Sequence, residues 1–298
     1  MIDAVFWSLA LAAVCLWLPR DLRTPLDRLL VLGPTRVSLR LWMIPAMAAA
    51  MFAAAAGFID ARGLAALVVL ATAGHAANHA SGEVRPAAHL VVLGLCAGLF
   101  LHVVPGFANP KLLDGVVLGP GALPYTQYLN VDKGLAGLLL LGGYVPDRID
   151  RDQGHRRVTD FVWRFLLLVV AVMALSLLLG YVRWDPKRPE WWPMWMGVML
   201  VLTALPEEAA FRGVIHTWLA ERRGDPASVL AIVLGGLAFG LAHAAGGPLY
   251  VAVASVAGIG YGWIYASTRS IGAAILAHAG LNTIHFLLFT YPALAPAP

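Results

Sequence analysis

The chain has 298 residues, of which 60% are hydrophobic and only 13% are charged, with a formal net charge of +4. A mean hydropathy of +0.75, with apolar stretches along the whole length, excludes an ordinary soluble protein. Alternating strand patterns are absent, so we predict an all-α fold, a polytopic transmembrane helical bundle. The basic residues gather at the edges of the apolar stretches. This placement indicates membrane topology and lipid contact, with no nucleic-acid partner.

We predict about ten membrane spans, with a range of eight to ten, from the apolar segments of helical length. The segments at 4–18, 64–78 and 134–145 are short, and we expect some of them to be half-inserted or to pack only against protein. The predicted spans lie, in chain order, at residues 4–18, 41–59, 64–78, 87–104, 134–145, 161–182, 193–219, 227–243, 249–266 and 271–289.

Arginine and lysine are concentrated in alternate connections between these spans. The connections at 19–40 and 146–160 are the most basic, which predicts that both face the cytoplasm and that the termini face outward. The connection at 105–132 is the longest on the opposite side and is rich in Pro and Gly. Cys15 and Cys96 lie in separate apolar spans, so neither a disulfide framework nor a thiolate metal site is indicated.

Two adjacent glutamates and an arginine interrupt the apolar segment 194–219. One ionised residue at the centre of a membrane helix costs about 2.5–3.5 kcal/mol on the insertion scale, so three of them need a reason. Glu208 and Arg212 are four residues apart, which predicts an ion pair on one helix face. Glu207 points about 100° away from the face that carries Glu208 and Arg212, so its carboxylate is expected to be available for catalysis. Pro206 directly precedes both glutamates and is expected to disturb the helix locally. The alternative is a buried ion-pair network that only fixes helix packing.

Two of the nine histidines have a companion residue four positions away, on the same face of the expected helix. His243 follows Phe239 by four residues at the end of one span, and His278 precedes Asn282 by four residues in the last span. Such a set, together with a carboxylate, is able to hold and polarise a water molecule. His75 and His79 have metal-like spacing, but no H-E-x-x-H arrangement accompanies them, so we do not predict a metal site there.

These residues form three motifs in order: E-E-x-x-x-R at 207–212, F-x-x-x-H at 239–243 and H-x-x-x-N at 278–282. In order and spacing they resemble the motifs of the CPBP family, the CAAX-processing and bacteriocin-processing intramembrane proteases. The resemblance covers roughly residues 161–289. It implies a protease core at 161–290, in the C-terminal half, and leaves residues 1–150 as a transmembrane extension of unknown role.

The resemblance implies a glutamic intramembrane endopeptidase. Glu207 would be the general base that, with His243, directs a water at a peptide carbonyl. Glu208, Arg212 and Phe239 would support the site, and His278 and Asn282 would donate hydrogen bonds to the oxyanion. No cofactor is expected, although two histidines and a glutamate would also suit zinc. The expected partners are a membrane-associated protein or peptide substrate and the lipid bilayer, and the expected location is the bacterial inner membrane.

Two other classes of function stay open from the residues. One is a non-catalytic membrane scaffold or immunity protein that keeps the motif residues for packing. The other is a proton-coupled transporter, because charges inside the membrane also mark ion routes. A second E-E-x-x-x-R, which a repeated transporter half would favour, is absent from the sequence.

Overall fold

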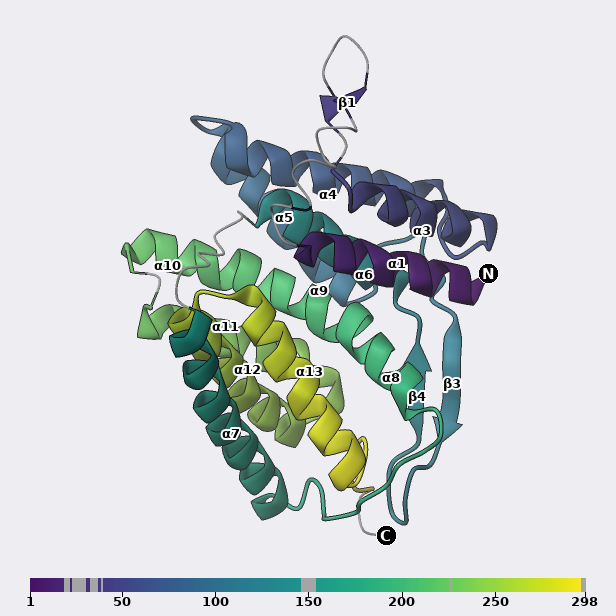
Figure 1. The fold of residues 1–298 in the computed structure, drawn as a ribbon, viewed down its shortest axis with the longest axis vertical. Coiled ribbons are helices and arrows are strands. Elements are labelled where there is room, and N and C mark those ends of the chain that lie inside the picture. The colour runs from purple at the N-terminus through teal and green to yellow at the C-terminus, as the bar shows by residue number, and fades with distance from the viewer. Residues whose placement is uncertain are drawn as a thin grey trace. The chain divides into compact units, whose positions relative to one another are not determined.

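The computed structural model describes residues 1–18, 22, 31–32, 37–38, 40–145, 154–225 and 227–295. Most of these residues are helical, as Figure 1 shows, which confirms the predicted helical class. Two compact units are found, and each is described by itself. Unit 1 comprises Met1–Pro110, Leu129–Pro146 and Val201–Glu207, and unit 2 comprises Lys111–Tyr128, Asp147–Leu200 and Glu208–Pro298.

Unit 1 is built around a short buried helix, α6 (Val131–Leu139), which the π-helical turn η1 (Leu140–Tyr144) extends. α6 packs against the other four helices of the unit, and nearly all of its residues are buried. It falls on the predicted span 134–145, so this short apolar segment packs against protein. The surrounding helices are α1 (Ile2–Trp17), α3 (Met43–Ala55), α4 (Ala61–His79) and α5 (Val84–Phe100).

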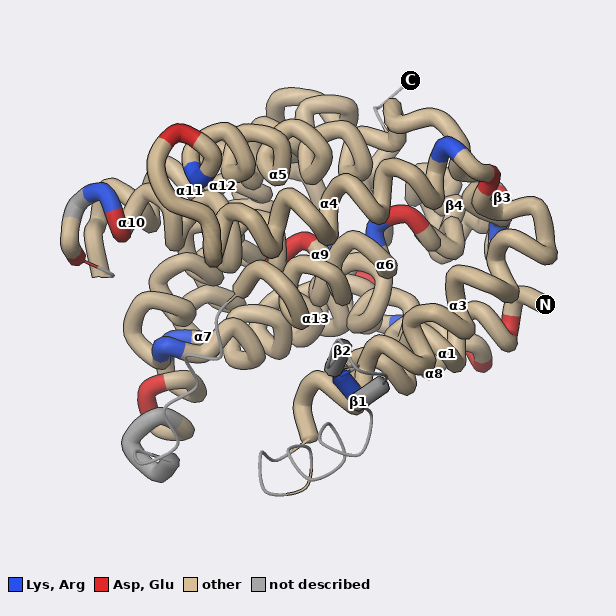
Figure 2. The backbone as a smooth tube through the Cα atoms, turned by 90° about the horizontal axis from the view of Figure 1, so that it is seen from above, with Lys and Arg blue, Asp and Glu red and all other residues tan. Residues whose placement is uncertain are grey.

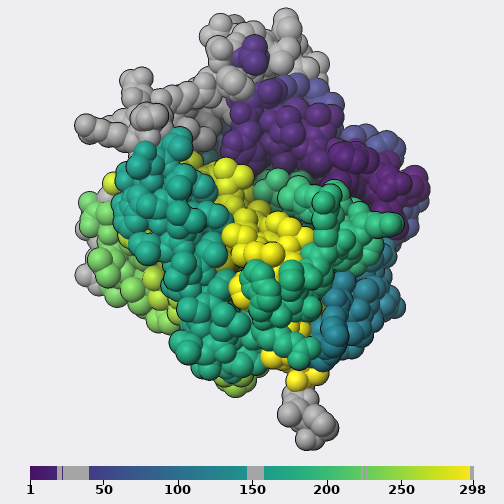
Figure 3. Space-filling view, turned by 60° about the horizontal axis from the view of Figure 1, so that its bottom comes forward, coloured from purple at the N-terminus to yellow at the C-terminus, as the bar shows by residue number. Residues whose placement is uncertain are grey.

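Unit 2 holds the longest apolar helices. α11 (Val229–Ala242) and α12 (Pro248–Thr268) pack closely, because small residues face each other across their interface. A Cβ on Gly258 would lie 2.8 Å from the carbonyl oxygen of Gly236, and one on Gly240 would overlap Ser255. α7 (Gly154–Leu178) and α13 (Ile271–Leu288) also pack on α12. In Figure 3, part of α13 (yellow) is visible at the surface of unit 2 between teal and green segments.

A further helical series runs from Trp192 to Arg223 without interruption in the sequence. Its segments are α8 (Trp192–Val198), η2 (Met199–Ala204), α9 (Leu205–Glu208), η3 (Ala209–His216) and α10 (Thr217–Arg223), and η2 and η3 are π-helical. A 3-10 turn, η4 (Ala244–Gly246), follows α11. In unit 2, Trp195 and Met199 form a buried cluster with Phe286 and Tyr291.

The all-α prediction needs one correction, since two short antiparallel strand pairs are present. β1 (Val31–Leu32) pairs with β2 (Val37–Ser38), and β3 (Lys111–Val116) pairs with β4 (Tyr125–Tyr128). The second pair lies in the Pro- and Gly-rich connection at 105–132. Tyr and Thr favour strands, and the Gly-Pro-Gly at 119–121 favours a turn between the two strands.

Among the described residues, three helices are long and apolar enough to cross a membrane: Val158–Leu178, Pro248–Thr268 and Ile271–Leu288. Four shorter apolar helices are Ile2–Trp17, Met43–Ala55, Val84–Phe100 and Val229–Ala242. In Figure 2, the few charged residues (Lys and Arg blue, Asp and Glu red) are separated by long stretches of backbone without charge. Every predicted span overlaps a helix, but the number that cross the bilayer stays a prediction. The basic connections at 19–40 and 146–160 lie largely outside the described residues.

Candidate active site

The two glutamates occupy α9, a single α-helical turn between the π-helical segments η2 and η3. Pro206 has no backbone N–H, and its ring crowds the carbonyl of the residue four before it. A π-helical register widens the turn, and π-helical insertions recur at functional sites. The disturbance predicted at Pro206 is therefore present as a change of helical register around Glu207 and Glu208.

Glu208 and Arg212 form the ion pair that their spacing predicts. Arg212 Nε lies 3.1 Å from Glu208 Oε2, and Arg212 Nη1 donates to Glu208 Oε1 at 3.2 Å. Both residues are buried, at 0% and 1% exposure. A buried pair is stable only when the hydrogen-bonding groups around it are well satisfied. Its surroundings therefore matter as much as the pair.

The guanidinium of Arg212 is enclosed by α11 and α12. Its Nη2 donates to the carbonyl of Gly258, and its central carbon lies 5.2 Å from the Phe239 ring and 5.4 Å from the Tyr261 ring. Both distances are within the range of a cation–π contact, which is stronger when the cation is desolvated. Phe239 thus contacts Arg212 as well as His243, and Tyr261 joins the site although sequence reasoning did not single it out.

His278 binds the same carboxylate from α13. Its Nδ1 lies 2.9 Å from Glu208 Oε1, and its ring stacks on Tyr261 with centroids 4.6 Å apart. A carboxylate accepts, so Nδ1 carries the proton. Nε2 is then an acceptor in the neutral ring and a donor only in the imidazolium form. An oxyanion-stabilising role for Nε2 of His278 therefore requires the imidazolium form of the ring.

His243 lies at the C-terminal end of α11, where its Nδ1 donates to the carbonyl of Phe239 at 2.7 Å. This bond fixes the neutral tautomer, so the lone pair is on Nε2. The Phe239 ring lies between the two imidazoles, 4.6 Å from that of His243 and 5.5 Å from that of His278. His243 is therefore oriented to accept a proton through Nε2.

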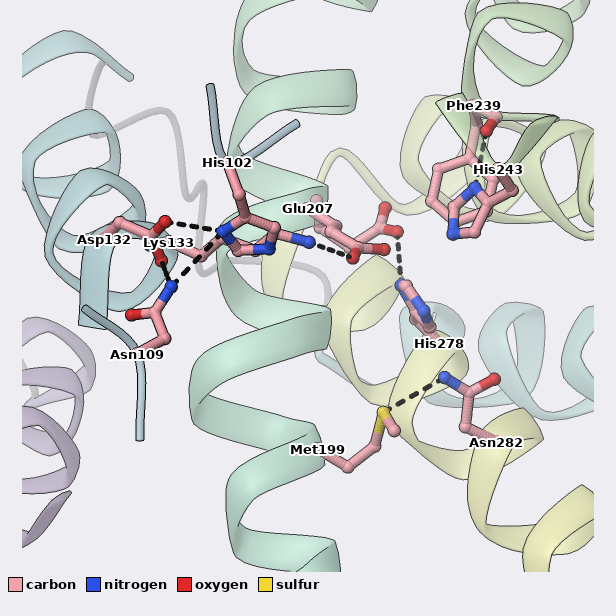
Figure 4. A network of polar contacts seen from close by, with 11 residues as sticks. His102, Asn109, Asp132, Lys133, Met199, Glu207, Phe239, His243, His278 and Asn282 are labelled. Atoms are coloured by element: carbon pink, nitrogen blue, oxygen red, sulfur yellow. Dashed lines mark hydrogen bonds and ion pairs between the residues drawn. The ribbon is translucent and has the colours of Figure 1, made fainter. Parts of the chain in front are cut away.

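Asn282 follows His278 by one turn of α13 and is half-buried. Its Nδ2 lies 3.1 Å from the Met199 sulfur, as Figure 4 shows. A thioether is a weak acceptor, so this contact competes poorly with a carbonyl or oxyanion oxygen. Within unit 2, Arg212, Glu208, His278, Phe239 and His243 thus form one continuous set of contacts.

Glu207, the predicted base, directly precedes Glu208 in the chain and belongs to unit 1. It is buried, and its Oε1 lies 3.7 Å from Lys133 Nζ (Figure 4). We expected Glu207 to have no counter-charge on its own helix, and sequence reasoning missed a cation supplied by a distant segment. The available signal was the pair Asp132-Lys133 directly before a Gly-rich apolar segment.

A metal site is not evident in the described part of the chain, where no three His, Cys, Asp or Glu side chains are grouped to hold an ion. The rings of His75 and His79 stack at 4.2 Å, and His79 Nδ1 bonds to the carbonyl of His75. The metal-like spacing at 75 and 79 therefore corresponds to a stacked pair.

Residues 189–284, about a third of the chain, match the family described as type II CAAX prenyl endopeptidase Rce1-like. This segment of the chain is similar to the CAAX protease family. All three motifs of the CAAX protease type lie within the matched segment, whereas Lys133 lies outside it. No curated protein and no solved structure matches the chain. The family and the apolar helices together identify a membrane protein related to proteases.

Proposed function

We propose that this protein is an intramembrane endopeptidase that hydrolyses a peptide bond of a membrane-associated protein or peptide. The observation that carries the proposal is the buried Glu208–Arg212–His278 set inside the segment that matches the CAAX protease family. Burying an arginine and a carboxylate together in apolar surroundings is costly. Holding an imidazole in one tautomer next to them is the kind of arrangement that proton-transfer chemistry needs.

In the proposed mechanism, Glu207 is the general base and His243 Nε2 helps to orient the attacking water. The water loses a proton as its oxygen attacks the carbonyl carbon, and the carbonyl oxygen becomes the oxyanion. Asn282 Nδ2 and the imidazolium form of His278 would donate to that oxygen. Glu208 would hold the His278 ring in position, while Arg212 holds Glu208.

The proposed substrate class rests on the match of residues 189–284 to a family of CAAX prenyl endopeptidases. For this chain we propose the broader class of a membrane-associated chain cleaved near its C-terminus. We place the enzyme in the inner membrane of a bacterium, with no cofactor required.

The test compares the membrane proteomes of cells that contain the wild-type protein, Glu207→Gln or no protein. We expect C-terminal peptides of one or a few membrane-associated proteins to be lost only with the wild-type protein. Glu207→Gln keeps the shape but removes the ionisable group, and we expect cleavage to fall at least about 100-fold.

Glu221→Gln is the matched control, because Glu221 is an exposed glutamate on α10 of the same helical series. It should leave cleavage unchanged. Equal processing by the wild-type protein and Glu207→Gln would refute Glu207 as the base. Identical proteomes with and without the protein would refute the endopeptidase proposal.

A further inference from the structure

Lys133 supplies a positive charge to Glu207 from outside the segment that matches the family. It lies in the first turn of α6 (Val131–Leu139), and its Nζ is 3.7 Å from Glu207 Oε1. Both side chains are largely buried, at 15% and 7% exposure. The Lys133 ammonium also lies 5.6 Å from the centroid of the Phe100 ring. An ammonium that is removed from water in this way interacts with a carboxylate more strongly than a surface lysine does.

Close backbone packing between α6 and the segment Val201–Glu207 brings the two charges together inside unit 1. A Cβ on Gly137 would lie 2.6 Å from Pro206 Cα, and one on Gly134 would lie 2.6 Å from Leu202 Cδ2. Gly137 is four residues after Lys133 and three after Gly134, so it is a neighbour of both on the surface of α6. The absence of side chains at these glycines allows the Pro206 backbone, and with it Glu207, to approach α6.

Asp132 fixes the turn from which Lys133 projects. It is 1% exposed, and its Oδ1 accepts from the backbone N–H of Lys133 at 2.8 Å and from Asn109 Nδ2 at 3.0 Å. Its Oδ2 lies 2.6 Å from Nδ1 of His102. Asn109 Oδ1 in turn accepts from the N–H of Val131. The first turn of α6 is thus tied to the 102–109 connection through side-chain bonds to the two residues that precede Lys133.

His102 is held in an unusual conformation by these contacts. Its φ is +56°, in the left-handed region that residues other than Gly adopt rarely. A backbone of this kind persists where the surrounding contacts determine it, and such positions gather at functional sites. The Asp132 oxygens already form hydrogen bonds with His102, Asn109 and the backbone N–H of Lys133. The Lys133 ammonium is therefore directed to Glu207, as Figure 4 shows.

We propose that Lys133 is a positioning residue for Glu207, anchored by Asp132, His102 and Asn109. The role in catalysis rests on the function proposed above, whereas the ion pair itself does not. The ammonium fixes the direction of the carboxylate and favours the ionised form that a general base requires. This gives residues 1–150 a part in the reaction.

The ion pair is tested without any substrate by a double-variant cycle of Lys133→Met, Glu207→Gln and the double variant in the full chain. Cys15 and Cys96 are both buried in unit 1, so the rate at which a maleimide labels them at a fixed temperature reports its opening. We expect each single variant to label faster than the wild-type protein. If the two substitutions acted independently, the labelling rate of the double variant would rise by the product of the factors measured for the two single variants. We expect it to be at least tenfold slower than that, because the double variant leaves no buried charge unpaired.

Arg62→Met with Asp60→Asn provides the control within unit 1. This ion pair has an N–O distance of 2.7 Å, but both side chains are exposed, at 71% and 46%. Its coupling should be below about fivefold. Additive effects at Lys133 and Glu207 would overturn the proposal. If Lys133→Met fails to fold, a double variant that does fold would support the ion pair. A double variant that also fails to fold would refute it.

The positioning role is tested on the substrate found in the proteome comparison. We expect Lys133→Met to lower kcat at least tenfold with KM nearly unchanged, and Lys133→Arg to recover most of the loss, because it restores the charge. A coupled cycle with an unchanged kcat would make the pair structural only and overturn the positioning role. A wild-type protein without peptidase activity would refute the proposed function, while the labelling cycle would still decide whether the pair exists.

Discussion

The Glu208–Arg212 pair allows a quantitative prediction on stability, with Glu208→Gln as the perturbation. The substitution keeps the size of the side chain and removes its charge. Arg212 would then be a buried cation that retains the Gly258 carbonyl and the faces of Phe239 and Tyr261, but no carboxylate. His278 would lose the acceptor that fixes its tautomer.

The magnitude follows from the burial of both partners. Removing one member of a fully buried ion pair typically costs about 3–5 kcal/mol, since the remaining charge is uncompensated. The amide oxygen of glutamine can still accept one bond from Arg212, so we expect the lower half of this range, about 3–4 kcal/mol. Since 1.4 kcal/mol is a factor of ten, the unfolded fraction should rise roughly 100- to 1000-fold.

The assay is thermal unfolding in detergent, followed as the loss of monodisperse protein after heating. Glu208→Gln should unfold at a clearly lower temperature than the wild-type protein. Arg212→Met should be destabilised similarly, and the double variant Glu208→Gln/Arg212→Met should lose less than the sum of the two. Glu221→Gln, on the exposed surface of α10, should shift the midpoint little.

A Glu208→Gln protein as stable as the wild-type protein would refute the claim that this carboxylate is needed to compensate Arg212. If Glu208→Gln were stable and inactive while Glu207→Gln stayed active, the roles of the two glutamates would be reversed.

Three further predictions concern the oxyanion, the metal and the topology. Asn282→Ala should lower kcat about 100- to 1000-fold, because it removes one positioned hydrogen-bond donor. Thr283→Ala should not lower kcat, because the Thr283 hydroxyl donates to the Ala279 carbonyl of its own helix. Similar rates for both variants would exclude Asn282 as a donor to the oxyanion. Purified protein should contain no stoichiometric zinc and should keep its activity in strong chelators; one tightly bound zinc per chain that is needed for activity would indicate a metalloprotease. A cysteine introduced at Ser38, in a background without Cys15 and Cys96, should be labelled only from the cytoplasmic side, and labelling only from outside would reverse the predicted orientation.

The parts of the site that could be predicted from sequence are those whose partners are neighbours on one helix. The Glu208–Arg212 pair follows from a spacing of four, and the register change around Pro206 follows from the missing N–H of proline. The close approach of α11 and α12 follows from Gly236, Gly240 and Gly258. Gly94 has the same kind of spacing to Gly98, but nothing lies within 4 Å of its Cβ position, so the small-residue pattern alone does not establish a helix contact.

The parts that could not be predicted depend on contacts between distant segments. Lys133 has no sequence relation to Glu207, and only the packing of Gly134 and Gly137 against the segment Val201–Glu207 brings the two charges together. The predicted connection ends at residue 132 and the next predicted span begins at 134, whereas Asp132 and Lys133 both lie in the first turn of the buried helix α6. The bond between His278 and Glu208 likewise depends on how α13 packs in unit 2, and a single sequence does not contain that information.

The two adjacent glutamates are distinguished by the cations they meet. Glu208 contacts Arg212 and His278, both on rigid helices of unit 2, whereas Glu207 meets Lys133 of unit 1. In the proposed reaction Glu207 takes a proton from water while the oxyanion gains the negative charge, so Lys133 keeps its charge after its partner is neutralised. The total charge of the buried groups and substrate stays constant, and only its position moves, which avoids the cost of creating a new charge in an apolar setting. The flexible side chain of Lys133 suits Glu207, the carboxylate that changes charge in the proposed reaction. The guanidinium of Arg212, which presents donors in a fixed planar geometry, suits Glu208, whose charge does not change. Loss of Lys133 should therefore act mainly on kcat, and loss of Arg212 mainly on folding.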